Sequence, residues 1–168
     1  MALLNEFQFQ LTIAGPHESE ILSAIDPDLL KARNLKTTVV GPVSDRTIVT
    51  DLYKNHDLVC VPSESEALGL VNAEAIAHGL SVVGTRVGGI PEVLGDGEYG
   101  YLSSNPTRES LASAIRNCIM NSEETNRKVT AAREFVIRRF GSGRLYQDLY
   151  STLKTIQDST ASHGLPKM

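Results

Sequence analysis

Two glutamates, Glu66 and Glu74, are the side chains of this chain whose type and spacing best suit chemistry, with seven residues between them. A short apolar run ends before Glu66, and a helical pattern that starts at Gly69 contains Glu74. The start of a helix presents unpaired backbone N–H groups and a partial positive charge, so it attracts phosphate. One carboxylate is therefore expected on each side of a phosphate-binding helix terminus.

Carboxylates beside a phosphate repel it electrostatically. Hydroxyl donors on the ligand must therefore bind both glutamates to offset this repulsion. Glu74 is expected about one and a half turns into the helix, where it can accept hydrogen bonds from the vicinal hydroxyls of a ribose. Glu66 precedes the helix and can take the hydroxyls of a second sugar. Gly69 has no Cβ, which lets a ligand approach the backbone closely. A nucleotide sugar carries hydroxyls on both sides of its diphosphate and fits this arrangement.

The spacing of the two glutamates is weak evidence by itself. Glutamates in the first turns of any helix stabilise its dipole by ~0.3–1 kcal/mol, and two of them eight positions apart arise often by chance. Only the order of the residues around them favours a site.

Composition limits the classes of protein that fit. The chain has 168 residues, a net charge of −4 and a pI near 5.6, which argues for one domain and against a surface that tracks nucleic acid. No apolar run is long enough to span a bilayer, and the start lacks a signal-peptide pattern, so we expect a cytoplasmic protein. Cys60 and Cys118 have neither disulfide nor metal-ligand spacing and are expected to be small buried hydrophobes.

Short apolar strands alternate with helical patterns, which predicts an α/β fold with a doubly wound parallel sheet. The expected strands are Phe7–Ala14, Thr37–Val40, Leu58–Val61 and Ser81–Val83. The expected helices are His17–Arg33 with a break near Asp26–Pro27, a helix capped by Ser44 and ending at Tyr53, Gly69–His78, Arg108–Met120, Glu123–Phe140 and Leu145–Ile156. Residues 1–158 are predicted to form the domain, and residues 159–168 a disordered tail.

Residues 62–92 (PSESEALGLVNAEAIAHGLSVVGTRVGGIPE) closely resemble the donor-binding signature of retaining glycosyltransferases of the GT-B fold, family 4 type. Weaker resemblance extends over Phe7 to Ile156. It implies a Rossmann-like C-terminal domain with extra C-terminal helices. It also implies a donor domain for the transfer of a hexosyl group from a nucleotide diphosphate sugar to an acceptor, usually without a metal or another cofactor.

The resemblance also implies roles for particular residues. Glu66 is similar to the glutamate that contacts the donor sugar and is often discussed as catalytic, and Glu74 to the one that binds ribose. Implied donor-binding positions also include the backbone of Gly69, Leu70 and Val71 for the phosphate, Gly88 and Gly89 along the pocket, and Gly15, Pro42 and Val43 beside ribose and base. A plain turn before a short Pro91–Glu92 helix explains the glycine pair equally well, and a turn followed by a core residue explains Pro42 and Val43 more simply.

The chain departs from the family pattern most at its start. Members place a glycine-arginine turn and a lysine in the first strand-loop-helix, where the two cations neutralise the diphosphate. Here Ala2–Glu6 corresponds to the inside of that helix, so the domain is expected to lack its first strand and loop. The N-terminal acceptor-binding domain is expected to be missing from this chain as well. Lys31, Lys36 and Arg86 are the candidates for a replacement charge. We therefore expect weak nucleotide-sugar binding and little transfer.

Two other functions remain open. One is a different enzyme on the same fold, such as a nucleotide-sugar 2-epimerase or a sugar phosphorylase. The other is a non-catalytic remnant that keeps the fold and not the chemistry. The absence of the glycine-arginine turn and the lysine is consistent with this alternative.

Overall fold

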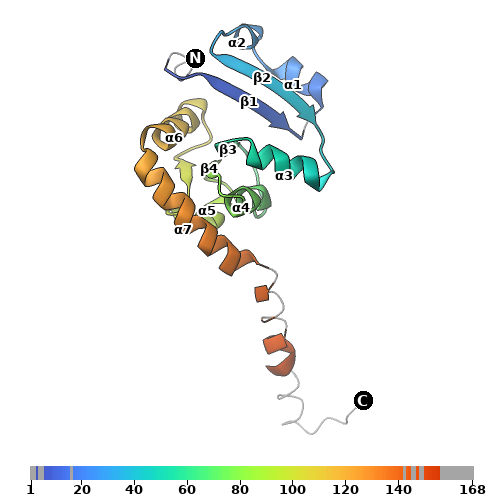
Figure 1. The fold of residues 1–168 in the computed structure, drawn as a ribbon, viewed down its shortest axis with the longest axis vertical. Coiled ribbons are helices and arrows are strands. Elements are labelled where there is room, and N and C mark those ends of the chain that lie inside the picture. The colour runs from blue at the N-terminus through green and yellow to red at the C-terminus, as the bar shows by residue number, and fades with distance from the viewer. Residues whose placement is uncertain are drawn as a thin grey trace.

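Parallel strands alternate with helices along the chain, which confirms the predicted α/β fold class (Figure 1). The computed structural model describes residues 3, 6–15, 17–141, 143, 144, 147 and 150–155, without the side chains of residues 18, 22, 29 and 30. The elements are β1 (Phe9–Ala14), α1 (Glu18–Ala24), α2 (Pro27–Leu30), β2 (Leu35–Gly41), α3 (Arg46–Lys54), β3 (Leu58–Val61), α4 (Leu70–Ala77), β4 (Ser81–Thr85), α5 (Ile90–Val93), the 3-10 helix η2 (Gly95–Gly97), β5 (Tyr101–Ser103), α6 (Arg108–Met120) and α7 (Ser122–Phe140).

The strands form two parallel sheets, one of β1 and β2 and one in the order β3-β4-β5. Within the described part of the chain, β1 pairs with β2 alone and β3 with β4 alone. The predicted sheet is therefore divided between β1 and β3. Helix α3 lies in the segment that connects β2 of one sheet to β3 of the other (Figure 1).

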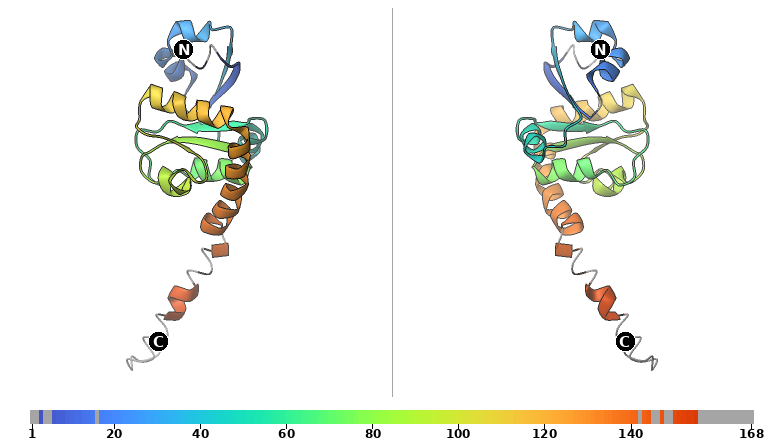
Figure 2. Two further views of the ribbon diagram at one scale, coloured as in Figure 1. Left: turned by 90° about the vertical axis from the view of Figure 1, so that its left-hand side faces the viewer. Right: turned by 90° about the vertical axis from the view of Figure 1, so that its right-hand side faces the viewer.

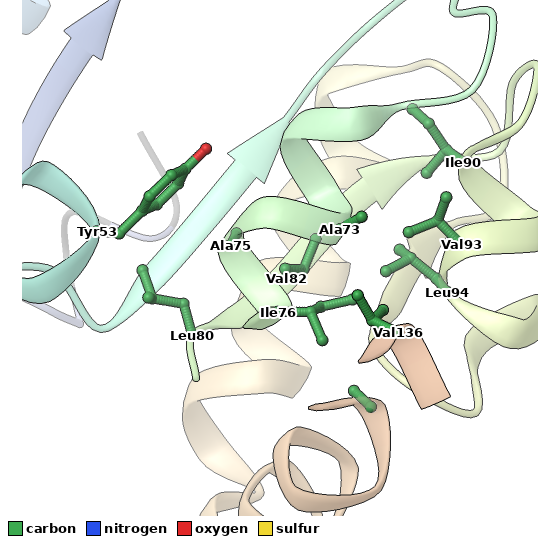
Figure 3. Packing of buried hydrophobic residues seen from close by; sticks show 11 residues of the cluster. Tyr53, Ala73, Ala75, Ile76, Leu80, Val82, Ile90, Val93, Leu94 and Val136 are labelled. Atoms are coloured by element: carbon green, nitrogen blue, oxygen red, sulfur yellow. The ribbon is translucent and has the colours of Figure 1, made fainter. Parts of the chain in front are cut away.

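Helices cover both faces of the three-stranded sheet, as a doubly wound fold requires. Val82 and Val83 of β4 are 1% and 0% exposed and point to opposite faces, because successive side chains in a strand alternate. Val82 packs in the larger cluster with residues of α4, α5 and α7, which Figure 3 shows around Ile76 and Leu94. Val83 packs against Ala114 and Cys118 of α6. Figure 2 shows α6 on one side of these strands and α4 on the other.

The β1–β2 sheet is more exposed than the three-stranded sheet. Leu11 of β1 is 42% exposed and Val40 of β2 is 37% exposed. A hydrogen bond of 2.8 Å between His56 Nε2 and Thr12 Oγ1 joins the residues after α3 to β1.

The structure corrects two predictions of local structure. Asp45, and not Ser44, caps α3, because its carboxylate accepts a hydrogen bond of 2.8 Å from the Thr47 amide. Strand β5 (Tyr101–Ser103) was not predicted, since three residues are too short to show an alternating pattern.

Two other predictions of local structure are confirmed over the described residues, and others concern residues outside them. The break near Pro27 is confirmed between α1 and α2. Of the predicted helix Leu145–Ile156, the described residues 147 and 150–155 are helical. Pro16 and the predicted tail 159–168 lie outside the described residues. Among the described helices, none is both long and apolar enough to cross a membrane.

Candidate functional site

The loop between β3 and α4 carries Glu66 at the carboxyl end of the three-stranded sheet. The hydroxyl of Thr85, at the end of β4, donates to the Ser63 carbonyl and ties the start of this loop to the sheet. Glu66 is half-buried, and its Oε1 accepts a hydrogen bond of 3.1 Å from the Ala67 amide. The loop is therefore anchored, and Glu66 has a defined place in front of the helix.

Gly69 forms the junction between this loop and α4. Its φ is +77°, a left-handed conformation that favours glycine, and it occupies the N-cap position, where no described side chain caps the helix. A Cβ on Gly69 would lie 2.6 Å from Asn72 Nδ2 and 3.6 Å from Glu66 Cγ. Leu70 and Val71 are 60% and 48% exposed, so the first turn of α4 faces solvent. Its amides are the kind of donors that bind an anion.

The glycine pair packs directly against the Glu66 loop. A Cβ on Gly88, whose φ is +51°, would lie 1.6 Å from the Glu66 carbonyl oxygen. The Gly89 amide donates a hydrogen bond of 3.0 Å to the Ala67 carbonyl. Glycine is needed here because two backbones meet, which is more than a plain turn requires. Contact of the pair with a ligand stays a prediction.

Glu74 lies on the exposed face of α4, where sequence reasoning expected it, but it has a neighbour that this reasoning missed. The hydroxyl of Tyr53, from the last turn of α3, donates a hydrogen bond of 3.3 Å to Glu74 Oε2. Burial, followed by the nearby Glu74 carboxylate, raises the pKa of Tyr53 to about 12. A signal was available, since a buried tyrosine usually finds a partner for its hydroxyl, although the sequence does not name that partner.

Gly15, Pro42 and Val43 lie at the carboxyl ends of β1 and β2, on the other sheet from the two glutamates. The Gly15 amide donates to the Gly41 carbonyl at 2.9 Å, which brings the two loops together. Pro42 is exposed and Val43 is half-buried, as in a turn that leads into packed chain. Their predicted place beside ribose and base therefore stays a prediction.

Two of the candidate replacement cations form ion pairs, and the third lies on the other sheet. Arg86 Nη1 lies 2.6 Å from Asp96 Oδ1, and Lys31 pairs with Asp28 at 3.9 Å on an exposed surface. Lys36 belongs to β2 and is exposed. Over the part of the chain that the structure describes, no group of His, Cys, Asp or Glu side chains is arranged to hold a metal.

Glu92, Cys60 and Cys118 have structural roles. Glu92 lies in the first turn of α5 and forms an ion pair of 2.9 Å with Arg139 of α7. Cys118 is buried and Cys60 half-buried, and burial raises the pKa of the Cys60 thiol to about 11. Since the thiolate is the reactive form, Cys60 is a poor nucleophile at neutral pH.

The fold is that of the C-terminal domain of GT-B glycosyltransferases. It resembles the crystal structure of the C-terminal domain of a glycosyl transferase group 1 family protein (LpcC) from Francisella tularensis, with a TM-score of 0.60 and 18% identity over 82% of this chain and 90% of that one. It also resembles Anabaena HepE, solved in complex with UDP and glucose, with a TM-score of 0.72 and 23% identity over 92% of this chain and 43% of that one.

The family itself follows from the sequence comparison. The model of the family described as glycosyl transferases group 1 matches residues 1–135, so the chain belongs to this family. A curated relative, the N-acetyl-alpha-D-glucosaminyl L-malate synthase of Bacillus anthracis, is 39% identical over 107 residues. That match covers 61% of this chain and 28% of the relative, so the chain spans little more than a quarter of its length.

Proposed function

We propose that this domain binds the nucleotide diphosphate sugar donor of a retaining glycosyltransferase that transfers a hexosyl group to an acceptor. The observation that carries the proposal is the pair of glutamates on either side of the exposed first turn of α4, within the stretch that resembles a donor-binding signature. HepE, which shares the fold, was solved with UDP and glucose, and this supports a ligand of the same class.

Each part of the site has a role on this proposal. The distal phosphate binds the amides of Gly69, Leu70 and Val71, where the dipole of α4 favours negative charge. Glu74 accepts hydrogen bonds from the ribose hydroxyls, and Glu66 accepts them from the donor sugar. Gly88 keeps the Glu66 loop in place, because its lack of a side chain permits the close backbone contact.

We infer that these 168 residues bind a donor better than they transfer its sugar. Transfer requires positive charge that stabilises the departing diphosphate, and a closed cleft that excludes water. Arg86, the one candidate cation inside the motif, already pairs with Asp96. On this proposal, an acceptor-binding domain and further positive charge are needed for transfer.

The divided sheet supports the same proposal. Doubly wound nucleotide-binding sheets have the strand order 3-2-1-4-5-6. The two sheets present here supply β2-β1 and β3-β4-β5, which correspond to 3-2 and 4-5-6. One further parallel strand between β1 and β3 would join them, and we propose that the complete domain has it.

Calorimetry on the purified chain tests the binding proposal. UDP-glucose, GDP-glucose and ADP-glucose are titrated into wild type and Glu74→Ala, and we expect one base to bind, with about tenfold weaker binding in the variant. Glu134→Ala is the matched control, because it removes one exposed helical glutamate far along α7 and should leave binding unchanged. Absence of binding by all three would contradict the proposal and favour a non-catalytic remnant.

The bound sugar also separates the transferase from the other enzymes of this fold. Incubation of the nucleotide sugar that binds with the chain, followed by NMR of the sugar, should show no 2-epimer. Incubation of oligosaccharides with the chain and added phosphate should likewise show no sugar 1-phosphate. Either product would replace the proposal with an epimerase or a phosphorylase. Robust glycosyl transfer by the chain alone would overturn our inference about activity.

A further inference from the structure

Tyr53 connects α3 to the carboxylate that is proposed to bind ribose. Its side chain is only 9% exposed, and its hydroxyl reaches Glu74 Oε2 at 3.3 Å. Its ring stacks on His78, one turn further along α4, with ring centroids 4.8 Å apart and an interplanar angle of 27°. Figure 3 shows the ring at the edge of the core, with its hydroxyl directed away from Leu80.

His78 is held in turn by the helix that it stacks on. Its Nδ1 lies 2.8 Å from the Glu74 carbonyl, a contact in which the ring nitrogen donates. The Tyr53 ring therefore has one neighbour fixed to α4 and belongs to the core cluster, at its edge. The phenol is thus a donor with a defined position, in contrast to an exposed tyrosine on a surface loop.

We propose that Tyr53 is a positioning residue, which holds the Glu74 carboxylate in the orientation that receives the ribose hydroxyls. The proposal rests on the proposed function, since it concerns how Glu74 binds the same ligand. An exposed glutamate samples many rotamers, and fixing one of them on binding costs conformational entropy. A hydrogen bond already made to Oε2 removes part of that cost and leaves the other carboxylate oxygen free for the ligand.

The hydroxyl of Tyr53, and not its ring, distinguishes this role from core packing. Phenylalanine would fill the same space and stack on His78 in the same way, but it could not donate to Glu74. A phenol of ordinary pKa is already protonated at neutral pH, and the raised pKa of Tyr53 keeps this true well above it, so the donor is present whenever a nucleotide binds. The position, burial and protonation state of the Tyr53 phenol are therefore those of a permanent hydrogen-bond donor to Glu74.

The test compares ribonucleotides with their 2′-deoxy counterparts in wild type and Tyr53→Phe. UDP, GDP and ADP are each titrated beside the 2′-deoxy form, and the ratio of the two dissociation constants reports the hydroxyl contact. We expect wild type to prefer the ribose form of its base by about tenfold. In Tyr53→Phe the preference should fall to about threefold, with the affinity for the deoxy form unchanged.

A matched control and a defined set of outcomes keep the test decisive. Tyr101→Phe removes another part-buried tyrosine hydroxyl, bonded to Thr125 Oγ1 at 2.7 Å and away from Glu74, and should keep the wild-type ratio. If Tyr53→Phe weakens both forms equally or keeps the ratio, Tyr53 only packs, and the positioning role is overturned while donor binding stands. If wild type shows no ribose preference, or Glu74→Ala keeps it, the ribose role of Glu74 fails and the inference falls with it.

A double variant provides a second measurement. In Glu74→Ala the hydroxyl of Tyr53 has no carboxylate to position, so adding Tyr53→Phe should cause no further loss of ribonucleotide affinity. Additive losses would show that Tyr53 acts independently of Glu74 and would overturn the inference. The melting temperature of each variant is measured in parallel, which separates loss of binding from loss of fold.

Discussion

The two sheets of this domain use the same kind of strand and differ in how they are packed. The site half, which comprises β3, β4 and β5 with α4, α5, α6 and α7, buries Val82 and Val83 almost completely. The β1–β2 pair, with α1 and α2, leaves Leu11 of its apolar strand 42% exposed. Strands of a parallel sheet are normally covered on both faces, so the pair is less fully covered than the site half.

The difference in burial bears on which predicted site residues have well-anchored positions. Glu66 and Glu74 stand on elements that are anchored in the site half through Gly69, Gly88 and the α4 core. Gly15, Pro42 and Val43, which were predicted to border ribose and base, stand on the less buried pair. We infer that phosphate and ribose contacts form on the rigid half, whereas the base contacts depend on how the pair is held.

The largest difference between the halves is expected in core truncations. Ile76 of α4 is 1% exposed. The variant Ile76→Ala should lower the free energy of unfolding by about 2–5 kcal/mol, because apolar burial is lost and a cavity forms. Leu11→Ala, the same kind of truncation on β1, should change it by about 0.5 kcal/mol or less. Urea denaturation measures both. Equal losses would show that the β1–β2 pair is as tightly packed as the site half.

A smaller contrast is expected between two left-handed glycines. Gly88 and Gly41 have φ of +51° and +64°, but a Cβ on Gly88 meets the Glu66 carbonyl, whereas a Cβ on Gly41 meets nothing within 4 Å. Gly41→Ala should cost only backbone strain, about 1 kcal/mol. Gly88→Ala should cost about 2–3 kcal/mol, because the Glu66 loop must also move.

Nucleotide titration sharpens the comparison of the two glycines. Displacement of the Glu66 loop should weaken binding of the nucleotide sugar in Gly88→Ala, whereas Gly41→Ala should retain it if phosphate and ribose contacts dominate. Comparable melting temperatures for the two variants would contradict the close backbone contact at Gly88.

The link between the halves should have a smaller effect that is confined to one of them. His56 lies 2.6 Å from the Leu52 carbonyl through Nδ1 and 2.8 Å from Thr12 Oγ1 through Nε2. His56→Ala should cost about 1 kcal/mol for the lost contacts. Amide hydrogen exchange should become faster in β1 and stay unchanged in β4. His17→Ala, an exposed histidine before α1, is the control, and an equal change in both strands would refute a local link.

Sequence reasoning predicted most of the site half because its signals are local. The order of residues from Pro62 to Glu92 placed the loop, the start of α4 and the short helix after Gly89, and all three are present. Helices α6 and α7 follow from long apolar periodicities. Strand β5 was missed because its three residues carry no period, and Asp45 was passed over because Ser44 is an equally good capping residue by type.

Contacts between distant segments could not be predicted in the same way. Nothing local in the sequence says that Gly88 lies on the Glu66 carbonyl, or that Tyr53 reaches Glu74 from 21 residues away. The expectation that the domain lacks its first strand came from the family resemblance, whereas the local sequences of β1 and β3 show no break, because each reads as an ordinary buried strand. Such features depend on which surfaces meet in space, and the spacing of residue types does not encode that.

The effect expected from Tyr53 itself is absent at neutral pH and appears only at alkaline pH. Its pKa in the folded chain is about 12, above the ordinary value of 10.0, so between these values the folded state holds a proton that the unfolded state has lost. The stabilisation associated with this proton is fully present below pH 10 and declines as the pH rises towards 12. Tyr53→Phe should lack this part of the alkaline decline, and urea denaturation at pH 8, 10 and 11 measures it. Tyr150→Phe, at a side chain that is 71% exposed, should decline as wild type does. If Tyr53→Phe also declines as wild type does, the hydroxyl is not buried beside Glu74 in the place that ties α3 to the site half.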